Sequence, residues 1–274
     1  MKPFYLLLRI IRHFLPDSIV SFLLSKQWII KPGMETRAPS YAFERYKKAL
    51  SDINFEINGK TAMIFGYGGN IQIACSFLDH GAKHVILLER EYFPEKKFHA
   101  DDYKEFSGYF LNDNNTFFPN PEYISIIHQD INLLAASNSL IPVDIIVSSS
   151  VYEHLTAVEN ITKSLSQLTN PRGVNIHFID LRDHFFRYPF EMLKYSETTW
   201  KRWLNPSSNL NRYRYDDYLK VFSKFFHSNK IIIEERDTAA YKKALPGIKE
   251  QFRTGDLEID AVTKMHIIAS DPKK

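Results

Sequence analysis

The sequence predicts an α/β fold with an open, mostly parallel sheet and helices on both faces. Short apolar runs that read as buried strands alternate along the chain with segments of helical periodicity, and this alternation is typical of such sheets. A glycine-rich turn over residues 66–69 separates the first strand from the helix that follows it. The order of strand, turn, helix and strand is the βαβ unit of parallel sheets.

The composition suits one large α/β domain with an appended segment. The 274 residues are 44% hydrophobic, which is enough to bury a substantial core. The formal net charge is only +3 and no basic stripe is evident, so nucleic acid is not an expected partner. The single cysteine, Cys75, leaves no intramolecular disulfide, and we expect a cytoplasmic protein.

The first part of the chain reads as helical. We expect residues 1–50 to form an N-terminal helical extension and residues 51–274 to form the main domain. The apolar stretches at 4–8 and 19–24 are shorter than the roughly 18 residues that a membrane span needs. No cleavage site of small residues follows them, so a signal peptide is not expected. They are interpreted either as amphipathic helices packed on the main domain or as helices lying on the inner face of a membrane.

The first βαβ unit can be followed residue by residue. Residues 60–65 form an apolar run that ends in glycines and predict a strand buried on both faces. Residues 70–80 have a helical pattern, and Gly81 stands where a glycine commonly ends a helix. Residues 84–89 predict the second strand, which should pair in parallel with the first.

Five further strands and one more helix are expected after this unit. The predicted strands cover residues 123–128, 143–148, 173–179, 230–235 and 263–269, and the helix covers residues 216–226. Together with the first two strands they predict a sheet of seven strands.

Two inserts interrupt the alternation. Residues 101–120 hold several Asn, Asp, Phe and Tyr residues and read as an irregular segment. Residues 182–215 are rich in aromatic and basic side chains: Trp200, Lys201, Arg202, Trp203, Arg212, Tyr213, Arg214 and Tyr215. The second insert is interpreted as a lid over an acceptor that carries phosphate or carboxylate. A packed pair of surface helices is the alternative.

The glycine turn predicts a ligand site. Glycines allow a tight turn and close approach of a ligand to the backbone, and the helix after the turn begins with free N–H groups. A dinucleotide fingerprint would need a third glycine where Ile71 stands, and the Walker pattern is absent. Pyrophosphate binding is therefore disfavoured, and a tight turn without a ligand is the alternative.

Two carboxylates follow neighbouring predicted strands. Glu89 ends the second strand, where it can accept hydrogen bonds from ribose hydroxyls; the alternative is a solvated charge beside Arg90. Asp130 follows the third strand and could accept a hydrogen bond from an adenine amino group, with Ile131 against the ring. The alternative for Asp130 is a helix N-cap. The loops after the fourth and fifth strands, residues 148–154 and 180–184, should line the same crevice.

Three motifs resemble the class I S-adenosylmethionine (SAM)-dependent methyltransferases. They are residues 64–70, 144–155 and 177–184, and they are similar to the type 11-like branch found in bacterial surface-polysaccharide biosynthesis. The resemblance covers about residues 55–270. It implies a Rossmann-like sheet, a closing antiparallel strand and SAM as the cofactor.

The resemblance also implies a set of cofactor-binding residues. They are Gly66, Tyr67, Gly68, Gly69 and Asn70 in the turn, Glu89 at the ribose, Asp130 and Ile131 at the adenine, and Ser148 in the fourth-strand loop. One position departs from the family pattern. The acidic residue that usually stands two positions before the first glycine is replaced by Ile64.

Methylation of a neutral hydroxyl benefits from a general base. His184 is the first candidate, with Asp183 or Asp180 to orient or assist it. His154 is the second candidate, and structural hydrogen bonds are the alternative for each histidine. His177 lies within a strand pattern and reads as structural. No His/Cys cluster has zinc-site spacing, so no metal site is expected.

These observations favour a SAM-dependent methyltransferase that O-methylates a saccharide or glycolipid precursor. Another small-molecule acceptor is the nearest variant of this hypothesis. The alternative from a different class is a non-catalytic SAM-fold protein that serves as a binding or scaffold module, and Ile64 favours it slightly. A nicotinamide-dependent oxidoreductase is disfavoured by Ile71, and an RNA methyltransferase by the nearly balanced charge. The sequence leaves the oligomeric state open.

Overall fold

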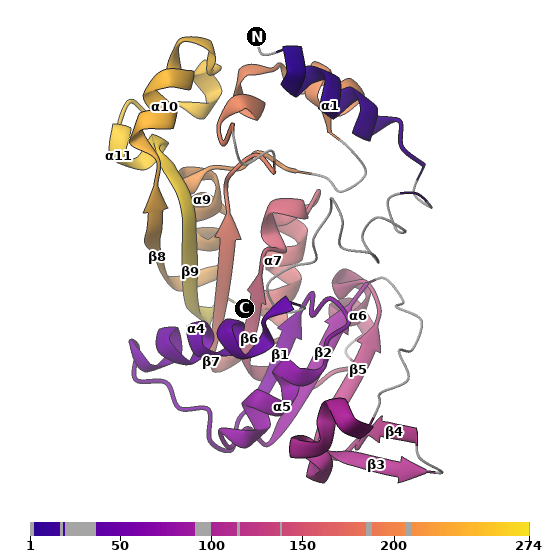
Figure 1. The fold of residues 1–274 in the computed structure, drawn as a ribbon. Coiled ribbons are helices and arrows are strands. Elements are labelled where there is room, and N and C mark those ends of the chain that lie inside the picture. Colours follow the sequence, from indigo (N-terminus) through magenta and orange to yellow (C-terminus); the bar gives the residue numbers. More distant parts are fainter. Residues whose placement is uncertain are drawn as a thin grey trace.

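The computed structural model describes residues 3–16, 19, 37–90, 100–113, 116–137, 139–184, 188–205 and 210–273. Its central sheet has seven strands and helices on both faces (Figure 1). The strands are β1 (Thr61–Phe65), β2 (His84–Glu89), β5 (Ile124–His128), β6 (Val143–Ser149), β7 (Thr169–Asp180), β8 (Phe226–Arg236) and β9 (Val262–Pro272). The predicted α/β fold and its seven strands are confirmed.

The strand order places a topological switch at the middle of the sheet. The order is β5–β2–β1–β6–β7–β9–β8. The first five strands of this order pair in parallel, and β9 runs antiparallel to both β7 and β8. The chain winds outward in one direction from β1 and in the other from β6. Open α/β sheets bind ligands at this switch, outside the carboxyl ends of the strands.

Each face of the sheet buries its own apolar core. The helices α4 (Pro39–Ser51) and α5 (Gln72–Asp79) cover one face, and α6 (Ile131–Ser137), α7 (Val158–Gln167) and α9 (Tyr215–Phe225) cover the other. Side chains of β1 alternate between these cores, with Ile64 in the first and Met63 in the second. This two-sided burial explains why the strand reads as one continuous apolar run.

A third apolar cluster lies beyond the carboxyl edge of the sheet. It joins α1 (Pro3–His13), residues 188–205 and the segment that holds α10 (Thr238–Ala244) and α11 (Leu257–Asp260). We call these three parts the cap, and Figure 1 shows them above the strands. Tyr5 of α1 stacks on Tyr195 with ring centroids 6.0 Å apart. The cap therefore unites segments that lie far apart in the sequence.

The prediction that residues 101–120 form an irregular segment is wrong. The structure has a 3-10 helix, η1 (Ala100–Tyr109), followed by the antiparallel hairpin of β3 (Phe110–Asp113) and β4 (Thr116–Pro119). Phe110 is buried against the first core. These strands have four residues each, which is too short for the period of two to stand out in the sequence.

The other predicted elements are confirmed within a few residues. Gly81 follows α5 with a φ of +89°, as a glycine that ends a helix should. β8 begins four residues earlier than predicted, and β7 starts at Thr169. In the described part of the chain, no helix is long and apolar enough to cross a membrane. The expected helical pattern at 19–24 lies almost entirely outside the described residues.

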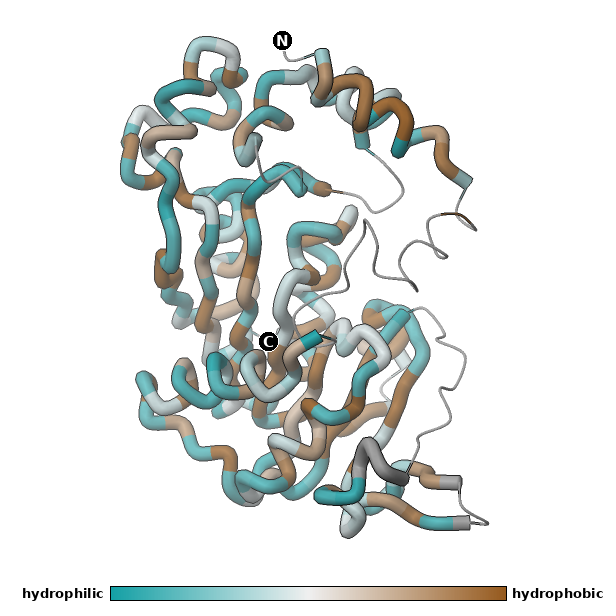
Figure 2. Tube along the Cα trace, in the orientation of Figure 1, coloured by the Kyte–Doolittle hydropathy of each residue, from teal (hydrophilic) through white to brown (hydrophobic). Residues whose placement is uncertain are grey.

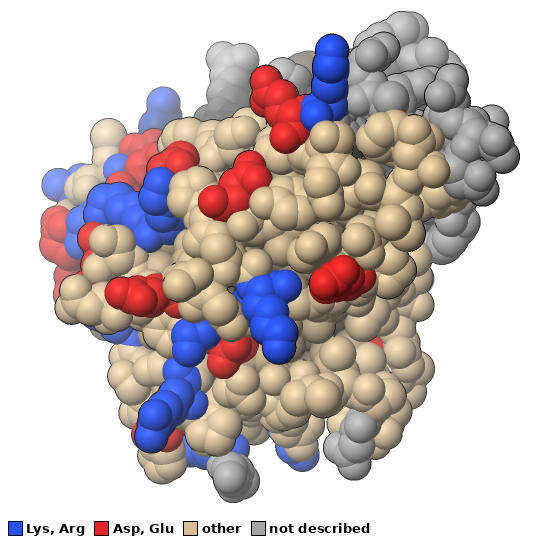
Figure 3. All heavy atoms as spheres, turned by 90° about the horizontal axis from the view of Figure 1, so that it is seen from below, with Lys and Arg blue, Asp and Glu red and all other residues tan. Residues whose placement is uncertain are grey.

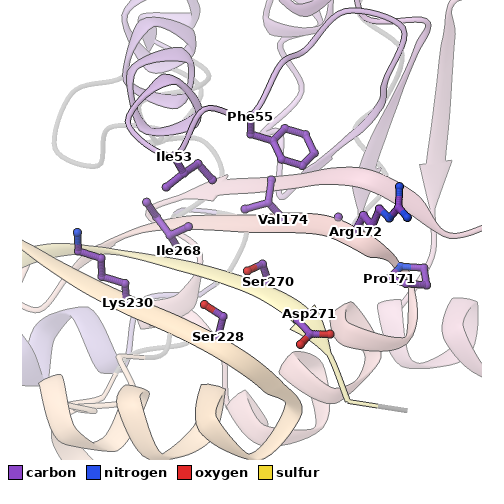
Figure 4. Close-up of a pocket in the computed structure, with 11 residues that line it drawn as sticks. Ile53, Phe55, Pro171, Arg172, Val174, Ser228, Lys230, Ile268, Ser270 and Asp271 are labelled. Carbon is purple, nitrogen blue, oxygen red and sulfur yellow. The ribbon is translucent and has the colours of Figure 1, made fainter.

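The amino edge of the sheet offers a shallow pocket. Its volume is about 440 Å³, and Ile53, Phe55, Arg172, Lys230 and Asp271 are among the residues that line it (Figure 4). On the face seen from below in Figure 3, acidic and basic side chains are interspersed among the described residues. The pocket lies at the start of β7, and β1 starts at the same edge because the two strands run in parallel. The glycine turn follows the other end of β1, so the pocket and the turn lie at opposite edges of the sheet.

Candidate functional site

The turn after β1 has a backbone that only glycine adopts readily. Gly66, Gly68 and Gly69 have φ values of +78°, +65° and +82°, in the left-handed region that β-carbons disfavour. The N–H of Gly66 donates to the carbonyl of Leu88 at 2.9 Å, which fixes the turn to β2. A β-carbon on Gly66 would lie 2.5 Å from Cγ2 of Val151. The turn thus lies directly against the loop that follows β6.

Tyr67 and Asn70 complete the turn. Oδ1 of Asn70 accepts a hydrogen bond from the N–H of Gln72 at 3.0 Å, at the start of α5. Tyr67 is buried, and its ring lies 6.5 Å from that of His128 on β5. Burial and the nearby Glu89 carboxylate raise the pKa of Tyr67 to about 12. The phenol therefore stays protonated, and it lies between the turn and the ends of β2 and β5.

Glu89 stands at the carboxyl end of β2, as predicted. Its register partner on β5 is His128. One carboxylate oxygen, Oε1, accepts a hydrogen bond from the N–H of Arg90 at 3.0 Å. The side chain is partly exposed, at the edge where the switch lies.

Asp130 and Ile131 lie at the start of α6. Oδ1 of Asp130 accepts a hydrogen bond from the N–H of Asn132 at 2.8 Å, which is the N-cap arrangement named as the alternative for this residue. Ile131 is buried in the second core with Met63 and Leu88. Both residues lie beside the predicted cofactor edge.

Ser148 is fully buried near the end of β6. Its hydroxyl lies 2.8 Å from Nδ1 of His177 on β7. Burial lowers the pKa of His177 to about 3, so the imidazole is neutral in the folded protein. These contacts agree with the interpretation that His177 supports the fold and is not a catalytic residue.

The loops after β6 and β7 bring Glu153, His154 and His184 together. One potential ligand atom from each side chain lies within 4.8 Å of the other two. The imidazole rings of His154 and His184 are 4.8 Å apart at an angle of 66°. Glu153 is only 3% exposed. Burial, together with the neighbouring His154, lowers the pKa of His184 to about 3, so the folded protein presents a neutral imidazole there.

The two aspartates predicted near His184 differ in their surroundings. Asp180 forms an ion pair with Arg182, whose Nε and Nη2 donate to it at 2.9 and 2.6 Å. Asp183 is fully buried, accepts a hydrogen bond from the hydroxyl of Tyr5 and forms an ion pair with Arg9. The carboxylate of Asp183 is thus bound to α1 of the cap.

Several residues that shape the site are absent from the sequence-based set. Asn211 donates from its backbone N–H to the carbonyl of Glu153 at 2.9 Å, and from Nδ2 to the carbonyls of Tyr152 and Leu155 at 2.7 and 3.0 Å. These bonds fix the loop after β6. No local sequence pattern marks Asn211, because it lies more than fifty positions from the loop that it holds.

Two arginines of the second insert bind backbone carbonyls, Arg212 in the cap and Arg214 in the loop after β7. Arg212 donates to the carbonyls of Met192 and Tyr195 at 3.1 and 2.8 Å, and Arg214 donates to the carbonyl of Leu181 at 2.8 Å. Both side chains are buried. The expectation that the arginines of this insert face an acceptor is therefore wrong for these two. Lys201 and Arg202 are exposed.

The fold has counterparts among solved structures. One is the 1,6-didemethyltoxoflavin-N1-methyltransferase of Burkholderia thailandensis, with bound 1,6-didemethyltoxoflavin and S-adenosylhomocysteine; the TM-score is 0.50, the identity 10%, and 94% of this chain and 87% of that chain are covered. A candidate sarcosine dimethylglycine methyltransferase from Galdieria sulphuraria gives a TM-score of 0.50 and 11% identity, with 93% of this chain and 99% of that chain covered.

A third match is to a longer protein. The chain spans 54% of the CurJ carbon methyltransferase, with a TM-score of 0.48 and 14% identity over 86% of this chain. No protein-family model and no curated protein matches the sequence. The matches with the Burkholderia and Galdieria proteins show that the chain has the Rossmann-like fold of class I SAM-dependent methyltransferases.

Proposed function

We propose that the protein is a SAM-dependent methyltransferase. The observation that carries this proposal is the left-handed glycine turn at the carboxyl end of β1. It lies at the switch between β1 and β6, with Glu89 at the end of the next strand. A fold of the same kind holds S-adenosylhomocysteine in the Burkholderia enzyme.

The turn and the neighbouring strand ends would divide the cofactor between them. Gly66, Gly68, Gly69 and Asn70 would hold the methionine part, with Tyr67 beside them. Glu89 would accept hydrogen bonds from both ribose hydroxyls. Asp130 and Ile131 would flank the adenine, and Ser148 would close the site from β6.

The methyl acceptor would enter between the turn and the cap. We propose that it is a small molecule, and that a saccharide or glycolipid hydroxyl is the methylated group. Residues 182–215 would act as its lid, where Arg202 lies 5.2 Å from the ring of the exposed Trp203. Aromatic and guanidinium groups together suit sugars that carry anionic groups.

In the transfer, the acceptor oxygen attacks the methyl carbon, the sulfur–carbon bond breaks, and the hydroxyl proton must leave. We propose that His184, or else His154, would assist its departure, with Asp180 nearby. Alignment and exclusion of water would be the other tasks of the site. The buried contacts of Asp183 with Tyr5 and Arg9 of the cap would keep the loop of His184 in place.

SAM titration by calorimetry tests the proposal. We expect micromolar binding to the wild type and at least a tenfold loss, about 1.4 kcal/mol, in Gly68→Arg. Gly59→Arg is the matched control, because Gly59 also has a positive φ of +71° but has no neighbouring atom within 4 Å of a β-carbon. This control should bind SAM as the wild type does.

Absence of SAM binding to the wild type would contradict the enzyme proposal. Ile64, which is fully buried in the first core, leaves no carboxylate at the usual acidic position. In that case the alternative, a non-catalytic binding or scaffold module with the same fold, would be favoured.

The proposal extends to where the protein works. Four large apolar side chains of and just beyond α1 are well exposed: Phe4 at 58%, Leu7 at 56%, Ile11 at 50% and Phe14 at 64%. Their spacing places them on one side of the helix, and Figure 2 shows the apolar character of this segment. We propose a cytoplasmic protein whose α1 contacts the inner surface of a membrane peripherally.

A further inference from the structure

The cluster of Glu153, His154 and His184 has the chemistry of a metal site. Two imidazoles and one carboxylate are the donor set found in several catalytic zinc and iron sites. One ligand atom from each lies within 4.8 Å of the other two. We propose that these three side chains bind a divalent transition-metal ion, with Zn²⁺ as its representative, at the carboxyl edge of the sheet.

The distances are compatible with closure around an ion. Zinc bonds to nitrogen and oxygen are about 2.0–2.2 Å long, so two ligand atoms of a tetrahedral site lie about 3.3 Å apart. To reach this spacing from the observed one, the ligand atoms need to move by on the order of 1 Å, which side-chain rotations can supply. His154 and His184 project from loops at the ends of adjacent strands, β6 and β7, so no strand has to move.

The geometry and charge of the cluster fit ligation. The imidazole rings of His154 and His184 are 4.8 Å apart at an angle of 66°, so one nitrogen of each ring can face a common ion. Glu153 would add one negative charge in a buried position. A divalent cation would bind this charge and would use the lone pairs of both rings.

The surrounding contacts hold the three ligands in place. The loop of Glu153 and His154 is fixed by the three hydrogen bonds from Asn211. The residue before His184 is Asp183, which is bound to Tyr5 and Arg9 of α1. A metal site needs such outer contacts, because they fix the ligand geometry before the ion arrives.

The proposed site has a role in the reaction, and this part rests on the proposed methyltransferase function. An ion with three protein ligands keeps an open position where an acceptor hydroxyl can bind. Coordination lowers the pKa of that hydroxyl and its proton passes to solvent, so the two histidines would serve as metal ligands in place of the base role given above. The alkoxide then forms the O–CH₃ bond while the S–CH₃ bond breaks. The electron pair of the S–CH₃ bond stays on the sulfur, which leaves neutral S-adenosylhomocysteine.

The test is a titration of the chelator-stripped, full-length protein with Zn²⁺ by calorimetry, repeated with Mg²⁺. We expect one Zn²⁺ per chain with micromolar or tighter affinity, and much weaker Mg²⁺ binding, because Mg²⁺ prefers oxygen ligands. Glu153→Gln, His154→Ala and His184→Ala should each weaken Zn²⁺ binding at least tenfold. The exposed His227 lies elsewhere on β8, and His227→Ala should not change it.

A SAM titration of the same samples separates the two proposals. Zn²⁺ binding without SAM binding would support the metal site and contradict the methyltransferase function. SAM binding without stoichiometric Zn²⁺ binding would overturn the metal site alone. Zn²⁺ binding that survives in His184→Ala, while that variant still binds SAM and is therefore folded, would also overturn it.

Discussion

At the scale of single residues, the buried imidazole of His177 makes stability depend on pH. Its pKa of about 3 in the folded protein lies below the value of about 6.5 expected in the unfolded chain. Between these two values the unfolded state binds more protons, so stability rises with pH. The contribution of the neutral His177 imidazole to the free energy of unfolding is complete above about pH 6.5 and is lost as the pH falls toward 3.

We therefore predict that His177→Asn flattens the pH dependence of unfolding. Between pH 7 and pH 5, the wild type should lose roughly 2 kcal/mol more stability through this residue than the variant does. Urea unfolding at both pH values measures the difference. The exposed His227→Asn should keep the wild-type slope, and an unchanged slope in His177→Asn would contradict the assignment.

A second residue-scale prediction concerns the ion pair of Asp183 with Arg9. Asp183→Asn leaves the Arg9 guanidinium buried without its carboxylate, and we expect a loss of about 3 kcal/mol. Asp180→Asn is the matched control. Its ion pair with Arg182 is more exposed, so the loss should be about 1 kcal/mol or less. Chemical denaturation measures both, and equal losses would argue against a special role for the buried pair.

The glycine turn could be predicted from sequence, and so could the meeting of the loops that hold His154 and His184, but the close approach of Glu153 to both imidazoles could not. Glycines that need a positive φ are visible in the letters themselves, and they follow a strand that is easy to recognise. His154 and His184 lie thirty positions apart, so only the pairing of β6 with β7 brings them together. The expectation that no metal would bind rested on local spacing, which carries no information about such a pair.

At the scale of elements, α1 has two different sides. Tyr5 and Arg9 are buried against the cap, and the exposed side carries Phe4, Leu7, Ile11 and, one residue beyond the helix, Phe14. We predict that the wild type sediments with vesicles of phosphatidylglycerol and phosphatidylcholine. Leu7→Glu/Ile11→Glu should reduce this binding at least tenfold, because burial of each side chain contributes about 1.5–3 kcal/mol.

The control for this experiment is Ile141→Glu, at an apolar residue that is 83% exposed and lies between α6 and β6. It should bind vesicles as the wild type does. Absence of wild-type binding, or equal binding by the double variant, would contradict the membrane contact. Circular dichroism of both variants would show that the fold is retained.

The buried strands of the central sheet were predictable, whereas the strands of the hairpin and the helix α7 were not. The strands around β1 have continuous apolar sequences because both of their faces are covered. The hairpin of β3 and β4 has only four residues in each strand. The position of α1 depends on contacts with η4 (Trp200–Leu204), such as Arg9 over Trp200 at 4.7 Å. No pattern within α1 itself specifies that partner.

At the scale of the whole molecule, the candidate site lies at the carboxyl edge of the sheet, on the side of the cap. The glycine turn is held to β2 by the hydrogen bond from Gly66. The loop of His184 continues from β7 and is bound to the cap through Asp183 and Tyr5. The pocket at the amino edge is separated from these residues by the length of the strands. The glycine turn and the loops after β6 and β7 thus lie together at the carboxyl edge of the described sheet.

The link from α1 to the loop of His184 also has a consequence for folding during synthesis. Arg9 and Asp183 are 174 positions apart, and ribosomes add roughly 5–20 residues per second. The helix therefore waits on the order of ten seconds or more before its partner is made. Contacts of such long range form late in folding, so the segment that is translated early completes its docking near the end. Until then its apolar surface is a ready target for chaperones or for the membrane.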